Sequence, residues 1–313
     1  MLPHEIDALL RAPSARQLAV FQHKDCYILN LLLHVIGGSR RVSDLRRGVF
    51  ARLLERASVK RALARASRGI LTPDCLRSEL PSAREQFSIT LSRWGGRHAS
   101  EFSDSWYQTS RPGQSLVVQL NFPAEHDRAY RRLVVPLHPH PFLYGAHPVR
   151  AEAPFSLAWA RLDADPGSPE VLIEEVQSDW VRAARDLAKI AEAWLSEGNP
   201  SFFEFDSRLQ ATAPALMSYV NRALLPYAKV WQEAMLMAAI EFAYAELGAR
   251  RIYFHTFEGG RIMKRLGCMP PRSLYTDLPE SFGFSKTRVP PRMFRKDPRV
   301  AGARVEWYTL SLV

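Results

Sequence analysis

The sequence predicts an α+β fold, in which a mixed, mostly antiparallel sheet with packed helices follows a basic helical N-terminal region. Segments in which apolar and polar residues alternate, as is typical of strands, recur through the middle of the chain. Long apolar helix patterns follow them, and Arg and Lys gather in the first quarter. With 47% hydrophobic and 24% charged residues among 313, the composition is that of a globular protein and excludes a disordered one.

The strand patterns are clearest at 87–94, 115–122, 155–163 and 170–177. Between the last two stands Asp165-Pro166-Gly167-Ser168, whose residue types favour a tight turn. Residues 155–177 are therefore predicted to form a β-hairpin. Its second strand begins with an apolar run and ends in a polar cluster.

Helix patterns and the remaining strands complete the prediction. Helices are expected over most of 1–36, over 43–68 in one or two pieces, and over 180–195, 227–247 and 257–266, and strands over 251–255 and 304–313. The chain then divides into a basic helical region, 1–84, and an α+β domain of catalytic type, 85–313.

The positive charge of the chain is concentrated in one segment. Between Arg40 and Arg68, ten Arg or Lys residues stand against Asp44 and Glu55, a local balance of +8 within a total of +10. Such a face attracts phosphates, so nucleic-acid or other polyanion binding is predicted there, with a solvated basic face as the alternative. The predicted polyanion-binding residues are Arg46, Arg47, Arg52, Arg56, Lys60, Arg61 and Arg65.

Several classes of protein are not favoured by the sequence. The three cysteines are far apart and form no Cys-x-x-Cys pair, which indicates a reducing, cytoplasmic compartment and neither a zinc ribbon nor a disulfide framework. No run of eighteen apolar residues predicts a membrane span.

Three histidines, His138, His140 and His147, lie within ten positions of a proline-rich connection. A His-x-His pair with a third histidine nearby is one pattern that binds transition metals. Prolines flank each of the three, and no cysteine or carboxylate cluster lies near them in sequence. They are predicted to be free of metal.

The polar cluster at the end of the hairpin holds the main candidate site. Unless a bulge intervenes, strict alternation puts Glu175 and Gln177 on the face of the apolar strand residues Val171 and Ile173, and Glu174 on the other face. Glu175 is then expected to be partly desolvated, with a raised pKa that suits a general base. Glu174 is expected to pair with Arg182 or Arg185, and Ser178 and Asp179 to form the rim of the pocket, with Asp179 also capping the helix that begins near Trp180. The alternative is an edge strand with a solvated end.

The block Glu174-Glu175-Val176-Gln177-Ser178-Asp179-Trp180, followed by Trp231, Gly248, Arg251-Ile252 and Thr256, resembles a domain of large polyvalent proteins of phages and mobile elements. The resemblance covers roughly residues 115–285. The chain departs from that family's His-Gln after the Trp, having Val181-Arg182, and from its Trp-Thr-Thr-Gly turn, having Phe254-His255-Thr256-Phe257. The resemblance implies a genomic context and no particular reaction.

The order of the predicted elements is similar to that of GNAT-type acyltransferases. Antiparallel strands are followed by a strand leading into a helix, a long helix, a strand, a helix and a last strand. The segment from Arg261 to Phe284 also resembles the end of that fold. The Arg/Gln-x-x-Gly-x-Gly/Ala motif, which holds the acyl-CoA pyrophosphate in that family, does not follow Gln177.

This second resemblance implies acyl transfer from acyl-CoA to an amine, without a metal. Glu175 or Glu174 would be the general base, with Gln177 beside it, and His255 or Tyr275 would protonate the leaving thiolate. The residues predicted to contribute to binding are Glu174, Ser178, Asp179, Trp180, Trp231, Thr256, Gly259 and Gly260.

Two other functions remain open at the level of sequence. Asp163 and Asp165, with Glu175 and Gln177, faintly resemble the acidic set of a metal-dependent nuclease, but the hairpin register separates them by roughly 16 Å. A non-catalytic adaptor or DNA-packaging module that holds nucleic acid through its basic helix is the other alternative. The acceptor of the predicted transferase is accordingly a small molecule or a nucleic acid.

Overall fold

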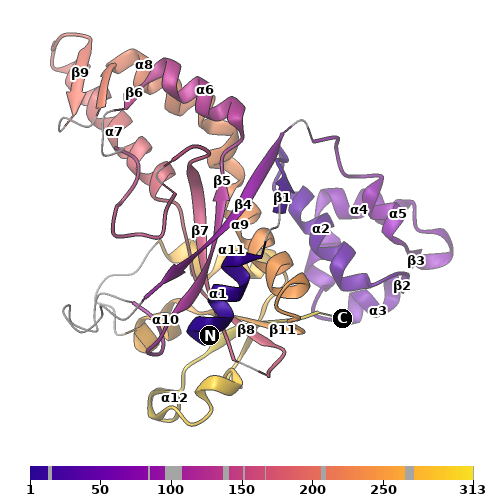
Figure 1. Cartoon of the computed structure of the whole chain (residues 1–313). Coiled ribbons are helices and arrows are strands. Elements are labelled where there is room, and N and C mark those ends of the chain that lie inside the picture. Colours follow the sequence, from indigo (N-terminus) through magenta and orange to yellow (C-terminus); the bar gives the residue numbers. More distant parts are fainter. Residues whose placement is uncertain are drawn as a thin grey trace.

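The fold is built on one eight-stranded sheet (Figure 1). The structure is a computed structural model that describes residues 1–12, 16–83, 85–95, 108–136, 141–150, 152–165, 167–205, 209–264 and 271–312. In spatial order the strands are β1 (Arg16–Ala19), β4 (Gln86–Trp94), β5 (Ser115–Asn121), β7 (Ser156–Ala164), β8 (Glu170–Gln177), β11 (Arg251–His255), β13 (Trp307–Ser311) and β12 (Ser285–Thr287). All neighbours are antiparallel except β8 and β11, which are parallel. The predicted α+β class and the predicted hairpin, β7 to β8, are confirmed.

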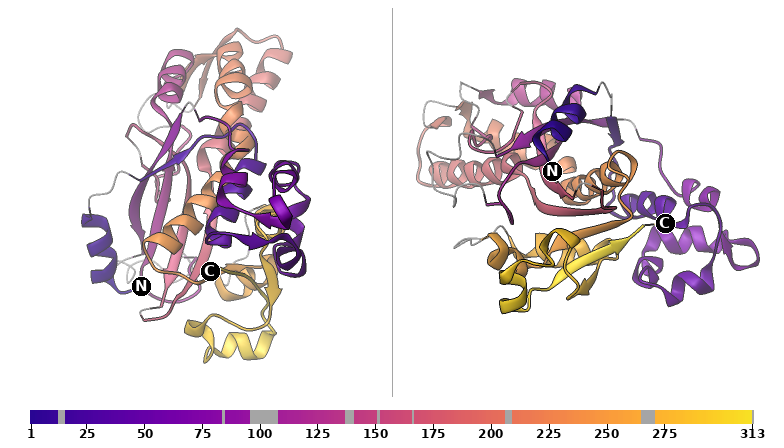
Figure 2. Two further views of the ribbon diagram at one scale, coloured as in Figure 1. Left: turned by 90° about the vertical axis from the view of Figure 1, so that its right-hand side faces the viewer. Right: turned by 60° about the horizontal axis from the view of Figure 1, so that its bottom comes forward.

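Helices surround this sheet on several sides (Figure 1). They are α1 (Pro3–Arg11), α2 (Asp25–Ile36), α3 (Val42–Arg47), α4 (Ala57–Ala64), α5 (Pro73–Arg77), α6 (Ala124–Leu133), α7 (Asp179–Ser196), α8 (Ala213–Ser218), α9 (Leu225–Ala245), α10 (Phe257–Lys264), α11 (Asp277–Ser281) and α12 (Pro298–Ala303). Figures 1 and 2 show α2 to α5 gathered on one side, α6 to α8 at one end, and α12 at the other end. Among the residues that the structure describes, no helix combines the length and apolar character needed to cross a membrane.

Two small sheets accompany the large one. One consists of β6 (Val135–Pro136), β10 (Leu209–Thr212) and β9 (Phe202–Phe205), and the other of β2 (Arg40–Arg41) and β3 (Ile70–Leu71). The sequence patterns predicted neither of the two small sheets and did not predict α6. Short, irregular elements carry too few residues for a period to be recognised.

The two faces of the large sheet differ in character. One face packs against α9, which is buried along most of its length, as its nearly uniform apolar composition predicts. The strand residues on that face are small or aliphatic, such as Ala158, Ala160 and Val176. The opposite face carries Trp159, Arg161 and other polar or aromatic side chains, and it positions the candidate site.

A β-bulge in β8 decides which side chains reach that polar face. Arg161 of β7 lies opposite Glu175, but the next residue, Leu162, lies opposite Ile173, so Glu174 is an extra residue with no partner in the register. The expected strict alternation is therefore wrong. Ile173 belongs to the core on the α9 side, whereas Glu175 lies opposite Arg161 on the polar face.

The N-terminal region differs from the prediction in two ways. The helix predicted over 43–68 breaks into α3, a 3₁₀ segment over 51–55 and α4, because Gly48 and Arg56 have extended backbones. The region also supplies a strand, since β1 pairs with β4 within the large sheet. Residues 1–84 are thus a helical region that shares the main sheet and, through α2, also contacts α9.

Candidate functional site

The candidate site lies where the parallel strands β8 and β11 stop pairing. Their register ends at Ile173 opposite Phe254, and β8 continues to Gln177 beyond this point. Charged side chains from β7, β8, β11 and α10 meet here, and all are buried: Arg161, Glu174, Glu175, His255 and Lys264. We call these five residues the buried charged cluster.

Glu174 is held by two residues from other parts of the chain. Ser110 donates its backbone N–H to Oε1 at 3.1 Å and its hydroxyl to Oε2 at 2.8 Å. Nε2 of His255 lies 3.1 Å from Oε2 of Glu174 and 2.8 Å from Oγ of Ser110. Because one imidazole nitrogen faces both the serine and the carboxylate, the three residues do not form a Ser-His-acid relay, which uses both nitrogens.

The protonation of this group follows from its contacts. Burial raises the pKa of Glu174, but the hydrogen bond from His255 and the charges of Lys264 and Arg161 bring that pKa down to about 2. Burial lowers the pKa of His255, against the effect of Glu174, so the imidazole is neutral at pH 7. Its proton then belongs on Nε2, which faces the ionised carboxylate. Nδ1 is left as a buried acceptor without a partner among the described residues.

Glu175 is ion-paired. Arg161 and Gln177 both donate to its carboxylate, and Nζ of Lys264 lies 3.4 Å from Oε2. Burial raises the pKa of Glu175, but the positive charges of Lys264 and Arg161 outweigh burial and lower it. The raised pKa expected from the sequence is therefore wrong in direction, and Glu175 is a poorer base than expected.

The bulge also changes the expected role of Glu174. Instead of facing away from Glu175 toward Arg182 or Arg185, Glu174 binds Ser110 and His255. Both glutamates are close enough to Lys264 for its positive charge to lower the pKa of each carboxyl group. The cluster balances two carboxylates with two basic side chains.

Tyr275 lies beside this cluster with its hydroxyl buried and without a partner among the described residues. Nζ of Lys264 is 5.9 Å from the centroid of its ring. Burial raises the pKa of the phenol well above 10, and the negative charge of Glu175 adds to this. Tyr275 therefore keeps its proton at all physiological pH values and can donate it.

The residues after β8 have different roles from those expected. Ser178, not Asp179, caps α7, because its hydroxyl accepts the N–H of Val181 at 3.2 Å. Asp179 instead accepts from Nδ1 of His147 at 2.9 Å, Nε1 of Trp159 at 3.2 Å and Arg182 at 2.9 Å.

His147 thus has a carboxylate partner, while His138 and His140 lie outside the described residues. In the described ranges, no three His, Cys, Asp or Glu side chains come together in an arrangement that could hold a metal ion.

An aromatic wall connects His147 with the buried charged cluster along the polar face of the sheet. Trp94 and Trp159 are nearly parallel, with ring centroids 6.3 Å apart, and His147 packs edge-on against both. The guanidinium of Arg161 lies 5.1 Å from the ring of Trp94. Gln177, opposite Trp159, is partly exposed, so the polar face reaches the surface there.

Sequence reasoning missed four members of the site: Ser110, Arg161, Lys264 and Trp94. Trp159 and Arg161 share one face of the predicted hairpin, and a basic residue within that strand was the one available signal, because the observed pairing of Arg161 with Glu175 depends on the bulge. Ser110 and Lys264 come from distant segments, and no local pattern marks either residue.

Other predicted site residues are not brought to the buried charged cluster. Trp180 packs in an aromatic cluster with Phe122 and Tyr130, and Trp231 lies in the hydrophobic core. Thr256 accepts the N–H of Gly259 at 3.0 Å and so caps the start of α10. Gly259 and Gly260 are buried, and a Cβ on Gly259 would lie 2.5 Å from the carbonyl oxygen of Glu306, so the tight packing there requires glycine.

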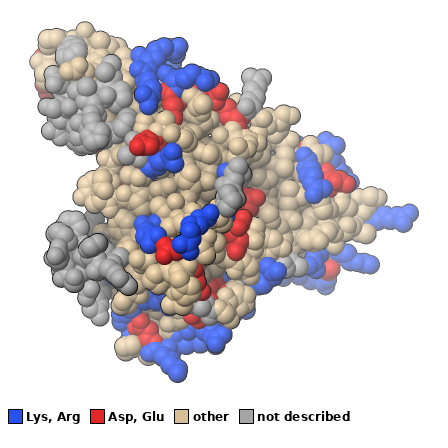
Figure 3. Space-filling model, viewed as in Figure 1, with Lys and Arg blue, Asp and Glu red and all other residues tan. Residues whose placement is uncertain are grey.

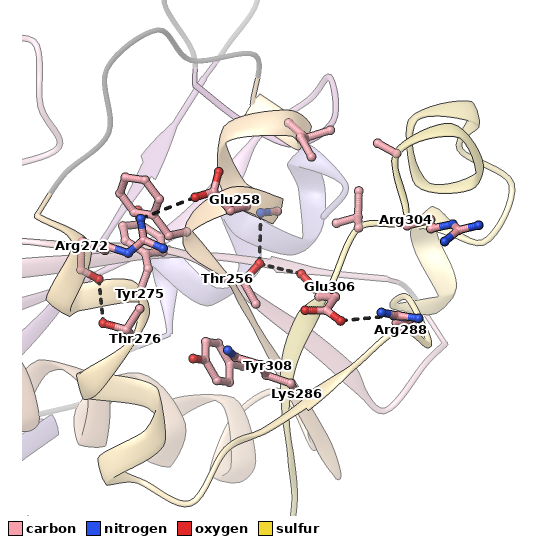
Figure 4. A pocket seen from close by; sticks show the side chains of 15 residues that line it. Thr256, Glu258, Arg272, Tyr275, Thr276, Lys286, Arg288, Arg304, Glu306 and Tyr308 are labelled. Atoms are coloured by element: carbon pink, nitrogen blue, oxygen red, sulfur yellow. Dashed lines mark hydrogen bonds and ion pairs between the residues drawn. The ribbon is translucent and has the colours of Figure 1, made fainter.

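A pocket of about 330 Å³ opens next to the cluster, between α10, β12 and β13 (Figure 4). Thr256 and Tyr275 line it, so Tyr275 contacts both the pocket and the surroundings of the cluster. Four basic residues and two glutamates also line it: Arg272, Lys286, Arg288, Arg304, Glu258 and Glu306.

Residues predicted from the sequence to bind polyanions or to form a nuclease-like acidic set take part in ion pairs in the structure. Six of the seven predicted polyanion-binding residues, all but Arg46, lie within 4 Å of a carboxylate oxygen, for example Arg61 and Arg65 on Glu79. Figure 3 shows basic side chains next to acidic ones over this part of the molecule. Polyanion binding stays a prediction, with less free charge than the sequence suggested. Asp163, a member of the nuclease-like set, is paired with Arg111 at 2.5 Å.

Comparison with known proteins adds no relative from which a role could be taken. No protein-family model, curated protein or solved structure matches the chain.

Proposed function

We propose that the protein is a GNAT-like N-acyltransferase, which moves an acyl group from acyl-CoA to an amine acceptor at the end of the parallel pair β8–β11. Three features support the proposal. The element order is the one that the sequence analysis associated with this class, the parallel pairing ends inside the sheet, and the bulge at Glu174 turns polar side chains toward that point.

One observation carries the proposal. A neutral imidazole nitrogen, Nδ1 of His255, and a protonated phenol, Tyr275, are both buried and both lack a partner among the described residues. Buried polar atoms normally have hydrogen-bond partners, so unpaired ones mark places where a substrate can complete the bonding. An acceptor and a donor of this kind are the pair that acyl transfer needs.

The roles follow from these protonation states. As the amine nitrogen forms a bond to the thioester carbonyl carbon, Nδ1 of His255 takes the proton that the nitrogen loses. Glu174 positions His255 through Nε2–H and stabilises the imidazolium that forms. The carbon–sulfur bond then breaks, and Tyr275 gives its proton to the leaving thiolate. Exchange with solvent returns a proton to Tyr275 and removes one from His255.

Glu175 is a positioning residue in this scheme. Its carboxylate fixes Arg161, Lys264 and Gln177, so it maintains the charge balance around the reacting groups. The expectation that Glu175 itself is the base is replaced by His255.

The test is thiol release from a series of acyl-CoA thioesters in the presence of amine acceptors. We expect Tyr275→Phe and His255→Gln each to lower kcat by about 10²- to 10⁴-fold, the usual contribution of general acid–base catalysis. Tyr130→Phe, which changes a buried tyrosine of the aromatic cluster around Trp180, is the matched control. Circular dichroism reports whether each variant is folded. Absence of both thiol release and acyl-CoA binding in the wild type would refute the proposal.

A further inference from the structure

The pocket beside Tyr275 has a surplus of positive charge. Its four basic residues stand against two glutamates, and each glutamate already has a partner: Arg272 lies 3.6 Å from Glu258, and Arg288 lies 3.1 Å from Glu306. Lys286 and Arg304 form no ion pair with any described residue. Lys286 instead lies 5.7 Å from the ring centroid of Tyr308. Two positive charges thus remain available to a ligand.

Neutral hydrogen-bond donors accompany these charges. Thr256 and Tyr275 line the pocket, but the hydroxyl of Tyr275 is buried, so the donors that face a ligand here are backbone N–H groups. The pocket also includes the start of α10, where Thr256 caps the N–H of Gly259 but the N–H groups of Phe257 and Glu258 have no intrahelical acceptor. Cations together with unpaired donors are typical of sites for phosphate groups.

The start of α7, the other long helix that begins beside the cluster, is closed to an anion. Ser178 caps α7 as Thr256 caps α10, but the first position of α7 holds the buried carboxylate of Asp179. Glu258 of α10, by contrast, is exposed and paired with Arg272. A phosphate at the start of α7 would face a buried negative charge. Of the two helix starts beside the cluster, only that of α10 combines with free positive charge.

We infer that the pocket between α10, β12 and β13 binds a phosphate-bearing ligand, with Lys286 and Arg304 as its main charged contacts. The identity of the ligand rests on the proposed function: it is the phosphorylated nucleotide end of the acyl donor, whose thioester extends past Tyr275 to His255. A volume of about 330 Å³ is at the lower end of small-molecule sites and suits one end of a long ligand. The acyl donor and a free nucleotide both carry the phosphate group that the pocket would recognise.

The experiment is calorimetric titration of the full chain with coenzyme A, ADP and inorganic pyrophosphate. We expect the double variant Lys286→Ala/Arg304→Ala to weaken coenzyme A binding by about tenfold or more, and a rise in salt to weaken wild-type binding similarly. Arg132→Ala/Lys229→Ala removes the same net charge from exposed positions on α6 and α9 and is expected to change affinity less than about twofold. The reversal Lys286→Glu/Arg304→Glu is expected to abolish binding.

The outcomes separate this inference from the proposed function. If coenzyme A binds wild type and both Lys286/Arg304 variants equally, the inference is overturned while acyl transfer can stand. If ADP and pyrophosphate bind through Lys286 and Arg304 but no acyl-CoA releases thiol, the pocket is supported and the transferase proposal fails. If none of the three compounds binds at low salt, the pocket inference is wrong.

Discussion

Two regions of the molecule are rich in ion pairs, and they differ in their access to water. In the buried charged cluster, Arg161 and Glu175 each have 1% of the side chain exposed. In the N-terminal helices, Arg47 and Asp44 pair at 2.7 Å with 77% and 55% exposed. Water screens the second pair and leaves the first nearly unscreened. The number of pairs in a region therefore says little about its energetics, whereas burial decides it.

The largest expected effect is the removal of one buried cation. Arg161→Met leaves Glu175 buried with a single basic partner, which is expected to lower the free energy of unfolding by about 3–5 kcal/mol. Urea denaturation followed by tryptophan fluorescence measures this. Arg47→Met, at an exposed pair, is the control, with an expected change below about 1 kcal/mol. Equal losses in the two variants would contradict the comparison.

The second prediction concerns pH. Glu174 titrates near 4.5 when unfolded and near 2 when folded, so the unfolded chain takes up the proton first. The ionised carboxylate stabilises the fold above about pH 4.5, and this contribution, on the order of 3 kcal/mol, is lost as pH falls toward 2.

Glu174→Gln removes that titration. The stability difference between wild type and variant should therefore shrink as the pH of the denaturation experiment is lowered from 7 to 3. Glu192→Gln, at an exposed glutamate of α7, provides the control. A difference that stays constant with pH would show that Glu174 is not ionised in the fold.

Helix caps give a smaller contrast between the same two regions. Ser178 caps the 18-residue helix α7 from a buried position, whereas Thr72 caps the five-residue helix α5 with a longer hydrogen bond of 3.4 Å. We expect Ser178→Ala to cost about 1–2 kcal/mol and Thr72→Ala about 0.5 kcal/mol, as measured by thermal unfolding. Ser178→Thr should recover most of the loss, because a threonine hydroxyl can also accept from the N–H of Val181 and donate to the carbonyl oxygen of Leu157. Greater sensitivity at Thr72 would reverse this order.

The smallest expected effect is polyanion binding by the N-terminal helices. Since six of the seven basic residues have carboxylate partners, few counterions are available for release on binding. Affinity for a generic DNA duplex should be weak at low salt and vanish near physiological salt, which fluorescence anisotropy measures at two salt concentrations. Tight, salt-resistant binding would show that these ion pairs rearrange for a ligand.

The sequence was informative wherever structure depends on neighbouring residues. The hairpin of β7 and β8, the helices α7 and α9 and the strand β11 follow from alternation, helical periodicity and turn residues, and the structure confirms them. The strand end that carries Glu174 to Gln177 could be selected for the same reason. Contacts such as Ser110 with Glu174 join positions 64 residues apart, and no local pattern encodes them.

Two local features could not be decided from the sequence. A bulge adds one residue to a strand without any required residue type, so it was only an alternative to strict alternation, which assigned Glu174 to the wrong face. The basic helix was predicted over 43–68 in one or two pieces, because apolar spacing continues across Gly48 and Arg56, where the chain breaks into three.

The extra residue in β8 sets a rule for anyone who wishes to transplant this site into another scaffold. A recipient strand with regular pleating would present Glu174 and Glu175 on opposite sides and divide the constellation, even if every side chain were copied. Deleting one position from β8 would have the same result in the native protein, although the composition would hardly change. What has to be transferred is a length of chain, one residue longer than its neighbour, together with the groups that it displays.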